Sequence, residues 1–246
     1  MYKPRGQLFN RHMDMPLAGA GTARLRRRGE ALPRGERRQA ILRAAERLFA
    51  QHGYHGVTIR EIAEQAAVPL ALVGYYFGPK HELFHAIFEQ WRHTVDERLA
   101  LLAQACSGAA GGHRLRAIVA AFVEPVLQLR ASAEGEAYAL LVARELAYRT
   151  PEAERVLGDF FDPMAHAFID ALHGACPGST RPQAAWAYQF ALGALIHHIS
   201  DHRVQRLSRG RNPPNDPQAG ALLVDFIGAG VGAVLLPEPT LQRRRA

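Results

Sequence analysis

The chain has 246 residues, of which 48% are hydrophobic, and a formal net charge of +7. This length and apolar content suffice for a packed core and fit one or two all-helical domains. No run of about 18 uncharged apolar residues is present for a membrane span, and the N-terminus has arginine and proline where a secretion signal needs an apolar stretch. Cys106 and Cys176 lack the spacing of a metal site, so both are expected to be reduced thiols.

The basic excess is confined to the first part of the chain. Residues 1–38 hold ten Lys or Arg and three Asp or Glu, whereas residues 39–246 hold twenty of each. Residues 1–33 are rich in Gly, Pro and Arg with little apolar periodicity, which predicts a disordered basic tail. Two interpretations stay open: a tail that keeps the protein in solution, or an arm that contacts DNA phosphates or the minor groove. The clustered cations are Arg24, Arg26, Arg27, Arg28, Arg34, Arg37 and Arg38.

Residues 35–84 predict a helix-turn-helix. The apolar spacing of residues 35–51 indicates a first helix that ends before Gly53. Thr58 and Glu61 form the pattern of a capping box, which predicts a second helix from residue 59. After a turn at residues 66–68, a third short helix begins at residue 69 or 70 and ends at Gly78 and Pro79, which cannot continue it. Two helices of about two turns joined by such a turn match the motif.

These residues resemble the tetracycline-repressor (TetR) family of bacterial transcriptional regulators. The resemblance covers residues 37–84, in the stretches ILRAAERLFAQHGYHGVTIREIAEQAAV and YYFGPKHELF. Three positions depart from the family pattern: Ala67 replaces the usual turn glycine, Pro69 the frequent serine cap, and Gly74 the usual tyrosine before the aromatic pair. An alanine at positive φ costs roughly 1 kcal/mol. A subset of the family carries the same Pro-Leu-Ala-Leu-Val and Tyr-Tyr-Phe-Gly sequences, so these departures are interpreted as subfamily variation.

The third short helix supplies the candidate DNA contacts. Leu70 and Ala71 are expected to face the major groove, where apolar contact with thymine methyl groups and DNA shape give the readout. The resemblance implies that Tyr75, Tyr76 and Lys80 bind phosphates, which fixes register rather than sequence. Thr58 and Arg60, at the start of the preceding helix, are further phosphate candidates. The alternative for the tyrosine pair is that one of the two is a core residue.

The remainder of the chain reads as helical, without an alternating strand pattern. A long helix is expected over residues 81–106, about 40 Å in length, followed by a small-residue loop at 107–112. Further helices are expected over residues 113–129 with a bend at Pro125, 136–148, 151–172 after the Thr150 cap, 181–203, and 216–235 after a loop at 207–217.

Two sets of residues in this part are candidates for chemistry. A ligand site is predicted in the C-terminal domain. Its lining is expected to include some of the following aromatic and polar residues, although each of them can instead be a core residue: Phe122, Tyr138, His166, Phe168, Trp186, Tyr188 and Phe190. His198 and His202 stand four residues apart near His197 and Asp201, a spacing able to bind zinc, although histidines at a subunit contact or pocket rim are the commoner explanation. No glycine-rich phosphate loop or nucleophile elbow is present.

Together these patterns predict an all-α protein with an N-terminal helix-turn-helix three-helix head and a C-terminal helical effector and dimerisation domain. The expected divisions are a disordered basic tail (1–33), the DNA-binding domain (34–80), the ligand-binding and dimerisation domain (81–237) and a frayed tail (238–246). The resemblance implies a cytoplasmic dimeric repressor without enzymatic activity, cofactor or membrane partner. It would pair through its last two helices, bind a palindromic DNA operator, and be released by a small-molecule effector that moves the fourth helix. The alternatives are a metal-dependent enzyme using the His197, His198, Asp201 and His202 cluster, and a sequence-nonspecific DNA-binding protein.

Overall fold

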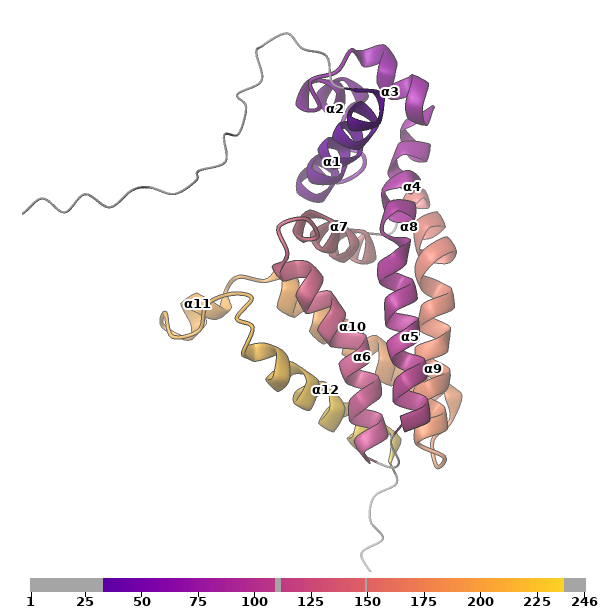
Figure 1. Cartoon of the computed structure of the whole chain (residues 1–246). Helices are drawn as coiled ribbons and strands as arrows, with labels where there is room; N and C mark the ends of the chain where they lie inside the picture. The colour runs from indigo at the N-terminus through magenta and orange to yellow at the C-terminus, as the bar shows by residue number, and fades with distance from the viewer. Residues whose placement is uncertain (1–32, 109–111, 149, 237–246) are drawn as a thin grey trace, which may run out of the picture. The chain divides into compact units, whose positions relative to one another are not determined.

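The computed structural model describes residues 33–108, 112–148 and 150–236, and in these ranges it contains helices and no strand. The predicted tails, 1–33 and 238–246, lie outside the described residues except for Pro33. The first part is built from α1 (Arg34–His52), α2 (Ile59–Gln65), α3 (Leu70–Phe77) and α4 (Lys80–Gln90). The remaining elements are α5 (Arg92–Gly108), α6 (Gly112–Ala131), α7 (Glu136–Ala147), α8 (Pro151–Val156), the π-helix η1 (Leu157–Phe161), α9 (Asp162–Ala175), α10 (Arg181–Ser200), α11 (Val204–Leu207) and α12 (Ala219–Leu235) (Figure 1).

The helix-turn-helix forms where the sequence predicts it. The Thr58 hydroxyl accepts a hydrogen bond from the Glu61 backbone N–H at 3.2 Å, and the Glu61 carboxylate accepts one from the Thr58 N–H at 2.7 Å, which completes the capping box. Gly53 ends α1 at φ 74° and Gly78 ends α3 at φ 70°. Between the two helices Ala67 has φ 53°, so the turn keeps its left-handed position although no glycine occupies it.

This alanine gives a direct test of local strain. The left-handed region costs a non-glycine residue roughly 1–2 kcal/mol, whereas glycine adopts it freely. Ala67→Gly is therefore expected to raise the free energy of unfolding by about 1 kcal/mol, measured by chemical denaturation. Ala66→Gly is the matched control, since Ala66 is buried at φ −81° and its replacement should destabilise the protein. A lower stability for Ala67→Gly would show that the turn carries no strain.

The long helix predicted over residues 81–106 is interrupted, and this corrects the expectation. Trp91 separates α4 from α5 with φ −96° and ψ 7°. Its N–H is shared between the carbonyl oxygens of Ile87 and Phe88, and its own carbonyl accepts from the Thr94 hydroxyl at 2.7 Å. The indole Nε1–H donates to Glu46 of α1 at 2.7 Å. The junction is thus held by a contact across 45 residues that helical periodicity does not encode.

The helix predicted over residues 151–172 is also divided. It begins at the predicted Thr150 cap, whose hydroxyl accepts from the Ala153 N–H, but passes through η1 before continuing as α9. Proline has no N–H to donate and its ring clashes with the carbonyl four residues earlier. The π-type turn, with the Asp162 N–H bonded to the Leu157 carbonyl, leads directly into Pro163 in the first turn of α9. Further on, α10 ends at Ser200 rather than Arg203 and a short α11 follows.

Two apolar clusters form the core. One joins α1–α4 to α7 and η1, through Tyr138, Leu141 and Phe160, and the other is formed by α5, α6, α9, α10 and α12. α7 packs on α1 and also contacts α6 and α10. Helix α7 therefore touches both clusters, which connects the head to the rest of the fold.

In the described part of the chain no helix has the length and apolar content to cross a membrane.

A buried carboxylate lies at the contact between α1 and the α4–α5 junction. Glu46 is 4% exposed, and burial raises its pKa above the ordinary 4.5, more than the Trp91 hydrogen bond and Arg47 lower it. Because the folded pKa is raised, the stabilising contribution of this group is complete below its ordinary pKa and is lost as the pH rises through the raised value. Deprotonation of Glu46 therefore costs stability.

Candidate functional site

The exposed face of α3 carries the predicted DNA-contacting residues. Leu70 is 47% exposed and Ala71 is also exposed, whereas Val73 is fully buried in the head. Tyr75 is 66% exposed and Tyr76 is half-buried, so neither tyrosine is a fully buried core residue. The face therefore presents small apolar groups beside two phenols.

The two tyrosines are tied to the start of α1 through Arg34. Its guanidinium donates to the Tyr75 hydroxyl at 3.0 Å, and the Tyr76 hydroxyl donates to the Arg34 carbonyl at 3.2 Å. Arg38 lies 5.0 Å above the Phe77 ring. These contacts place two cations of the basic cluster along the same edge as the phenols. The sequence analysis grouped Arg34 and Arg38 with the cluster of basic residues that leads into the first helix and missed their contacts with α3.

Lys80 and Thr58 are already engaged within the head. The Lys80 ammonium lies 4.4 Å from the Tyr54 ring centroid, and burial lowers its pKa despite the opposing effect of Glu152 and Glu61. The Thr58 side chain is exposed and makes the α2 cap, while Arg60 is exposed on α2. The seven predicted DNA-contacting residues thus lie on α2, α3, the α2 cap and the first residue of α4.

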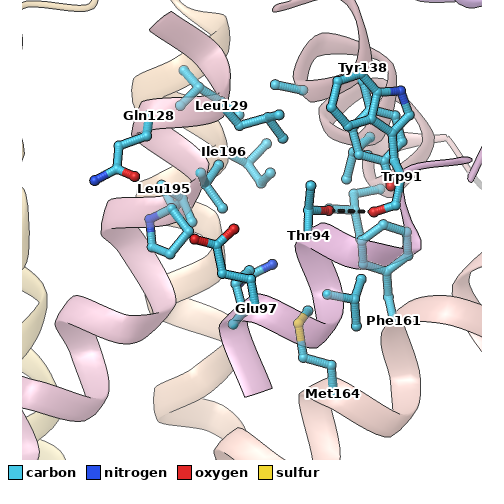
Figure 2. Close-up of a pocket in the computed structure, with 18 of the residues that line it drawn as sticks. Trp91, Thr94, Glu97, Gln128, Leu129, Tyr138, Phe161, Met164, Leu195 and Ile196 are labelled. Carbon is cyan, nitrogen blue, oxygen red and sulfur yellow. Dashed lines mark hydrogen bonds between the residues drawn. The ribbon is translucent and has the colours of Figure 1, made fainter. Parts of the chain in front are cut away.

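A cavity of about 290 Å³ lies inside the second part of the chain, enclosed by α5, α6, α7, η1, α9 and α10 (Figure 2). Its walls are mostly apolar, with Leu129, Met164 and Ile196 from three different helices. Trp91 stacks on Tyr138 with ring centroids 5.0 Å apart and an interplanar angle of 10°, forming an aromatic wall at one end. Polar lining residues that are exposed lie on α5 and α6 or just after them: His93, Glu97, Gln128 and Ser132.

Of the residues predicted to line a ligand site, Tyr138 and Tyr188 border this cavity. Phe122 and Phe168 are buried beside it, packed on each other at 5.4 Å, without lining it. The remaining three candidates do not line it either, because they are exposed to solvent: His166, Trp186 and Phe190. Aromatic content alone does not distinguish pocket walls from core or surface.

The sequence reading missed Arg98, which lines the cavity and is 8% exposed. Its guanidinium donates one hydrogen bond, to the Phe122 carbonyl at 3.2 Å, and the Nε–H has no partner. Burial lowers the pKa of Arg98, opposed by the nearby phenols of Tyr188 and Tyr138, and burial raises the pKa of both tyrosines. A signal was present in the sequence, since Val95, Arg98 and Leu102 share one helical stripe.

The outer faces of α10 and α12 expose large apolar side chains. Trp186 and Phe190 stack at 5.8 Å on α10, and each is more than 60% exposed. Leu222 and Phe226 on α12 are each 71% exposed. Ile227 and Val231 of the same α12 helix are buried against the core instead. Large exposed apolar side chains gathered on neighbouring helices are typical of an interaction site.

The histidine cluster does not assemble into a metal site. In the ranges that the structure describes, no group of three or more His, Cys, Asp or Glu side chains is placed to hold a metal ion. His197 lies 3.3 Å from the Asp201 carboxylate, which Arg203 engages at 2.6 Å, lowering the pKa of Asp201 to about 2. His202 is exposed, and burial lowers the pKa of His198. The arrangement is a helix-end ion pair.

A helix-turn-helix head joined to a helical domain with an internal cavity is the architecture of one-component DNA-binding regulators. Residues 41–87 match the tetR family of bacterial regulatory proteins, and residues 120–230 match the tetracyclin repressor-like C-terminal domain. The chain belongs to the TetR family.

Named relatives match only part of the chain. The HTH-type transcriptional activator FasR of Mycolicibacterium smegmatis is 39% identical over 99 residues, which are 40% of this chain and 44% of that protein. The repressor AcnR of Corynebacterium efficiens is 42% identical over 50 residues, 20% of this chain and 27% of that protein. The alignments thus span less than half of these relatives.

Solved structures are similar in fold over most of the chain at low identity. AmtR of Mycobacterium smegmatis has a TM-score of 0.55 at 21% identity, covering 84% of this chain and 89% of that one. FadR of Bacillus subtilis, solved in complex with stearoyl-CoA, has a TM-score of 0.52 at 14% identity, covering 78% and 98%. At these identities the likeness concerns the fold.

Proposed function

We propose that this protein is a dimeric transcriptional repressor that binds a palindromic DNA operator and is released by a small-molecule effector, with no enzymatic activity. The observation that carries the proposal is the exposed α3 face, with Leu70 and Ala71 open to solvent beside the Arg34-linked phenols. An exposed helix with apolar and phenolic groups fits the major groove and its flanking phosphates. Because its ligand is chromosomal DNA, we place the protein in the cytoplasm.

We assign the head to residues 34–80 and the effector and dimerisation functions to residues 81–237. The internal cavity supports an effector site, and a regulator of the same fold, FadR, was solved with stearoyl-CoA. The exposed apolar faces of α10 and α12 support pairing through the last two long helices. Named relatives include both an activator and a repressor, so the sign of regulation is part of the test.

The test is selection of bound sequences from genomic fragments and a random library, followed by a reporter assay with the selected operator. A palindromic consensus and lower reporter output in the presence of the protein would support the proposal. Binding that excess random-sequence DNA removes completely would support a nonspecific DNA-binding protein instead.

Residue roles in the head are tested by salt dependence. Lys80→Ala and Tyr75→Phe are expected to weaken binding to every sequence similarly, and the lysine variant should lower the slope of log affinity against log salt by about one unit. The contrast is Leu70→Ala, which should change sequence preference and leave the slope unchanged, because it removes an apolar base contact. Full affinity for Lys80→Ala with an altered sequence preference would reverse these assignments.

A further inference from the structure

Two arginines are buried in the described part of the chain, and their surroundings differ. Arg130 is 6% exposed; its Nε–H donates to the Ile199 carbonyl at 3.2 Å and its Nη1 pairs with Glu136 at 2.6 Å. Arg98 is 8% exposed, makes no ion pair with any described carboxylate, and leaves its Nε–H without a partner. One buried charge is neutralised by the protein and the other is not.

An unneutralised buried guanidinium is costly, because removal of its hydration is not repaid by a counter-charge. The faces of Phe122 and Phe168 lie 5.1 and 5.8 Å from Arg98 and supply a partial cation–π compensation. Cation–π contact occupies the face of the guanidinium but satisfies none of its N–H groups. Because Arg98 is one of the residues that line the cavity, an acceptor bound there could complete the hydrogen bonding of its guanidinium.

The cavity limits the size and shape of the molecule that carries this acceptor. Its volume of about 290 Å³ is near the lower end for small-molecule sites. Apart from Arg98, its buried polar lining is the two phenols of Tyr138 and Tyr188, which can donate to an ionised oxygen. Glu97, which with Arg98 and His93 completes the ionisable side chains of the lining other than the phenols, is exposed.

We propose that the effector is a compact apolar molecule with a single carboxylate, which Arg98 binds inside the cavity while the apolar body lies against the α6, α9 and α10 walls. This assignment rests on the proposed ligand-responsive function and names the ligand class. A planar guanidinium fits a carboxylate through two parallel N–H···O bonds, which gives both affinity and orientation. A neutral amide of the same body fills the same space without matching the charge.

The experiment uses the full chain without DNA and two acid–amide pairs, octanoate with octanamide and 4-phenylbutanoate with its amide. Calorimetric titration of the wild-type protein is expected to show at least one acid binding about tenfold or more tightly than its amide. Arg98→Met is expected to abolish this preference. Arg130→Met is the matched control, because it removes the other buried arginine and should retain the preference.

Thermal unfolding without ligand separates a binding role from a structural one. Arg98→Met is expected to melt no lower than the wild type, because it removes an unpaired buried charge, whereas Arg130→Met should melt lower. If Arg98→Met does not fold, Arg98→Lys takes its place and should reduce the acid preference several-fold, because one ammonium cannot form both bonds.

Three results would overturn the assignment: no binding of either acid up to millimolar concentration, equal binding of acid and amide by the wild type, or an acid preference that Arg98 variants keep. Failure of both Arg98→Met and Arg98→Lys to fold would show a structural arginine and overturn it as well. Each of these results leaves the selection of an operator unaffected, so the ligand class and the DNA-binding function fail separately.

Discussion

Replacement of Phe226 by glutamate is expected to give a folded monomer that no longer binds its operator with high affinity. Phe226 and Leu222 are each 71% exposed on α12, and Trp186 and Phe190 on α10 are similarly open. These four side chains make an apolar surface on two helices that pack on each other. In a twofold dimer each substitution occurs twice, so a central aromatic contact is lost on both sides.

The magnitude follows from the usual cost of losing such contacts. A central aromatic residue contributes at least about 2 kcal/mol to an interface, so two copies amount to about 4 kcal/mol, or roughly a 1,000-fold weaker dimer. Sedimentation at micromolar concentration should show dimers for the wild type and monomers for Phe226→Glu. Operator affinity should fall in parallel, since a monomer binds one half-site of a palindrome.

Two controls separate assembly from folding. Ile227→Glu changes the adjacent residue, which is 3% exposed, and should unfold the protein because it buries an unpaired charge. His166→Glu places the same charge on an exposed residue of α9 and should leave both the dimer and operator affinity intact. A wild-type protein that sediments as a monomer at micromolar concentration would refute pairing through these helices.

The head was predictable because its signals are local. Each signal lies within a few residues of the helix end or helix that it specifies. The capping box of Thr58 and Glu61 and the apolar stripe specify α2, and Gly53 and Gly78 at positive φ end α1 and α3. The same holds for the Thr150 cap of α8. The structure adds that Ala67 adopts the left-handed conformation that the motif requires, without the glycine that would make it easy.

The breaks and the cavity depend on contacts far apart in the sequence. Trp91 continues the apolar spacing of a long helix, and its separation of α4 from α5 coincides with a hydrogen bond to Glu46, 45 residues earlier. The cavity is bounded by six elements, so no single helical stripe identifies its walls. The sequence shows that Trp186 and Phe226 are apolar, but it does not show that both side chains are exposed in the folded single chain.

The second large effect concerns the coupling between ligand binding in the cavity and operator binding by the head. Trp91 lines the cavity, stacks on Tyr138 at 5.0 Å, and donates its indole N–H to Glu46 in α1. It is also the junction between α4, which belongs to the head cluster, and α5, which forms one cavity wall. A ligand that displaces this indole would therefore act on α1 and on the start of α5 together.

Trp91→Phe is expected to uncouple ligand binding from operator release. Phenylalanine keeps an aromatic ring against Tyr138 but cannot donate to Glu46, so ligand-induced movement of the wall no longer reaches α1 through this bond. In the wild type a coupling of 1–3 kcal/mol changes affinity about 5- to 150-fold, and linkage requires the same factor for ligand and for operator. In Trp91→Phe both factors should approach one while each binding event persists.

The measurement is a pair of titrations, ligand with and without operator and operator with and without ligand, using whichever carboxylate probe binds the wild type. Glu46→Gln is the matched control: its amide oxygen still accepts from Trp91, and it removes the buried charge whose pKa is raised, so coupling should persist and stability at neutral pH should rise. Trp91→Phe with the wild-type coupling factor would show that the signal bypasses this junction. Unequal factors in the two titrations of one variant would indicate that a further state takes part in binding.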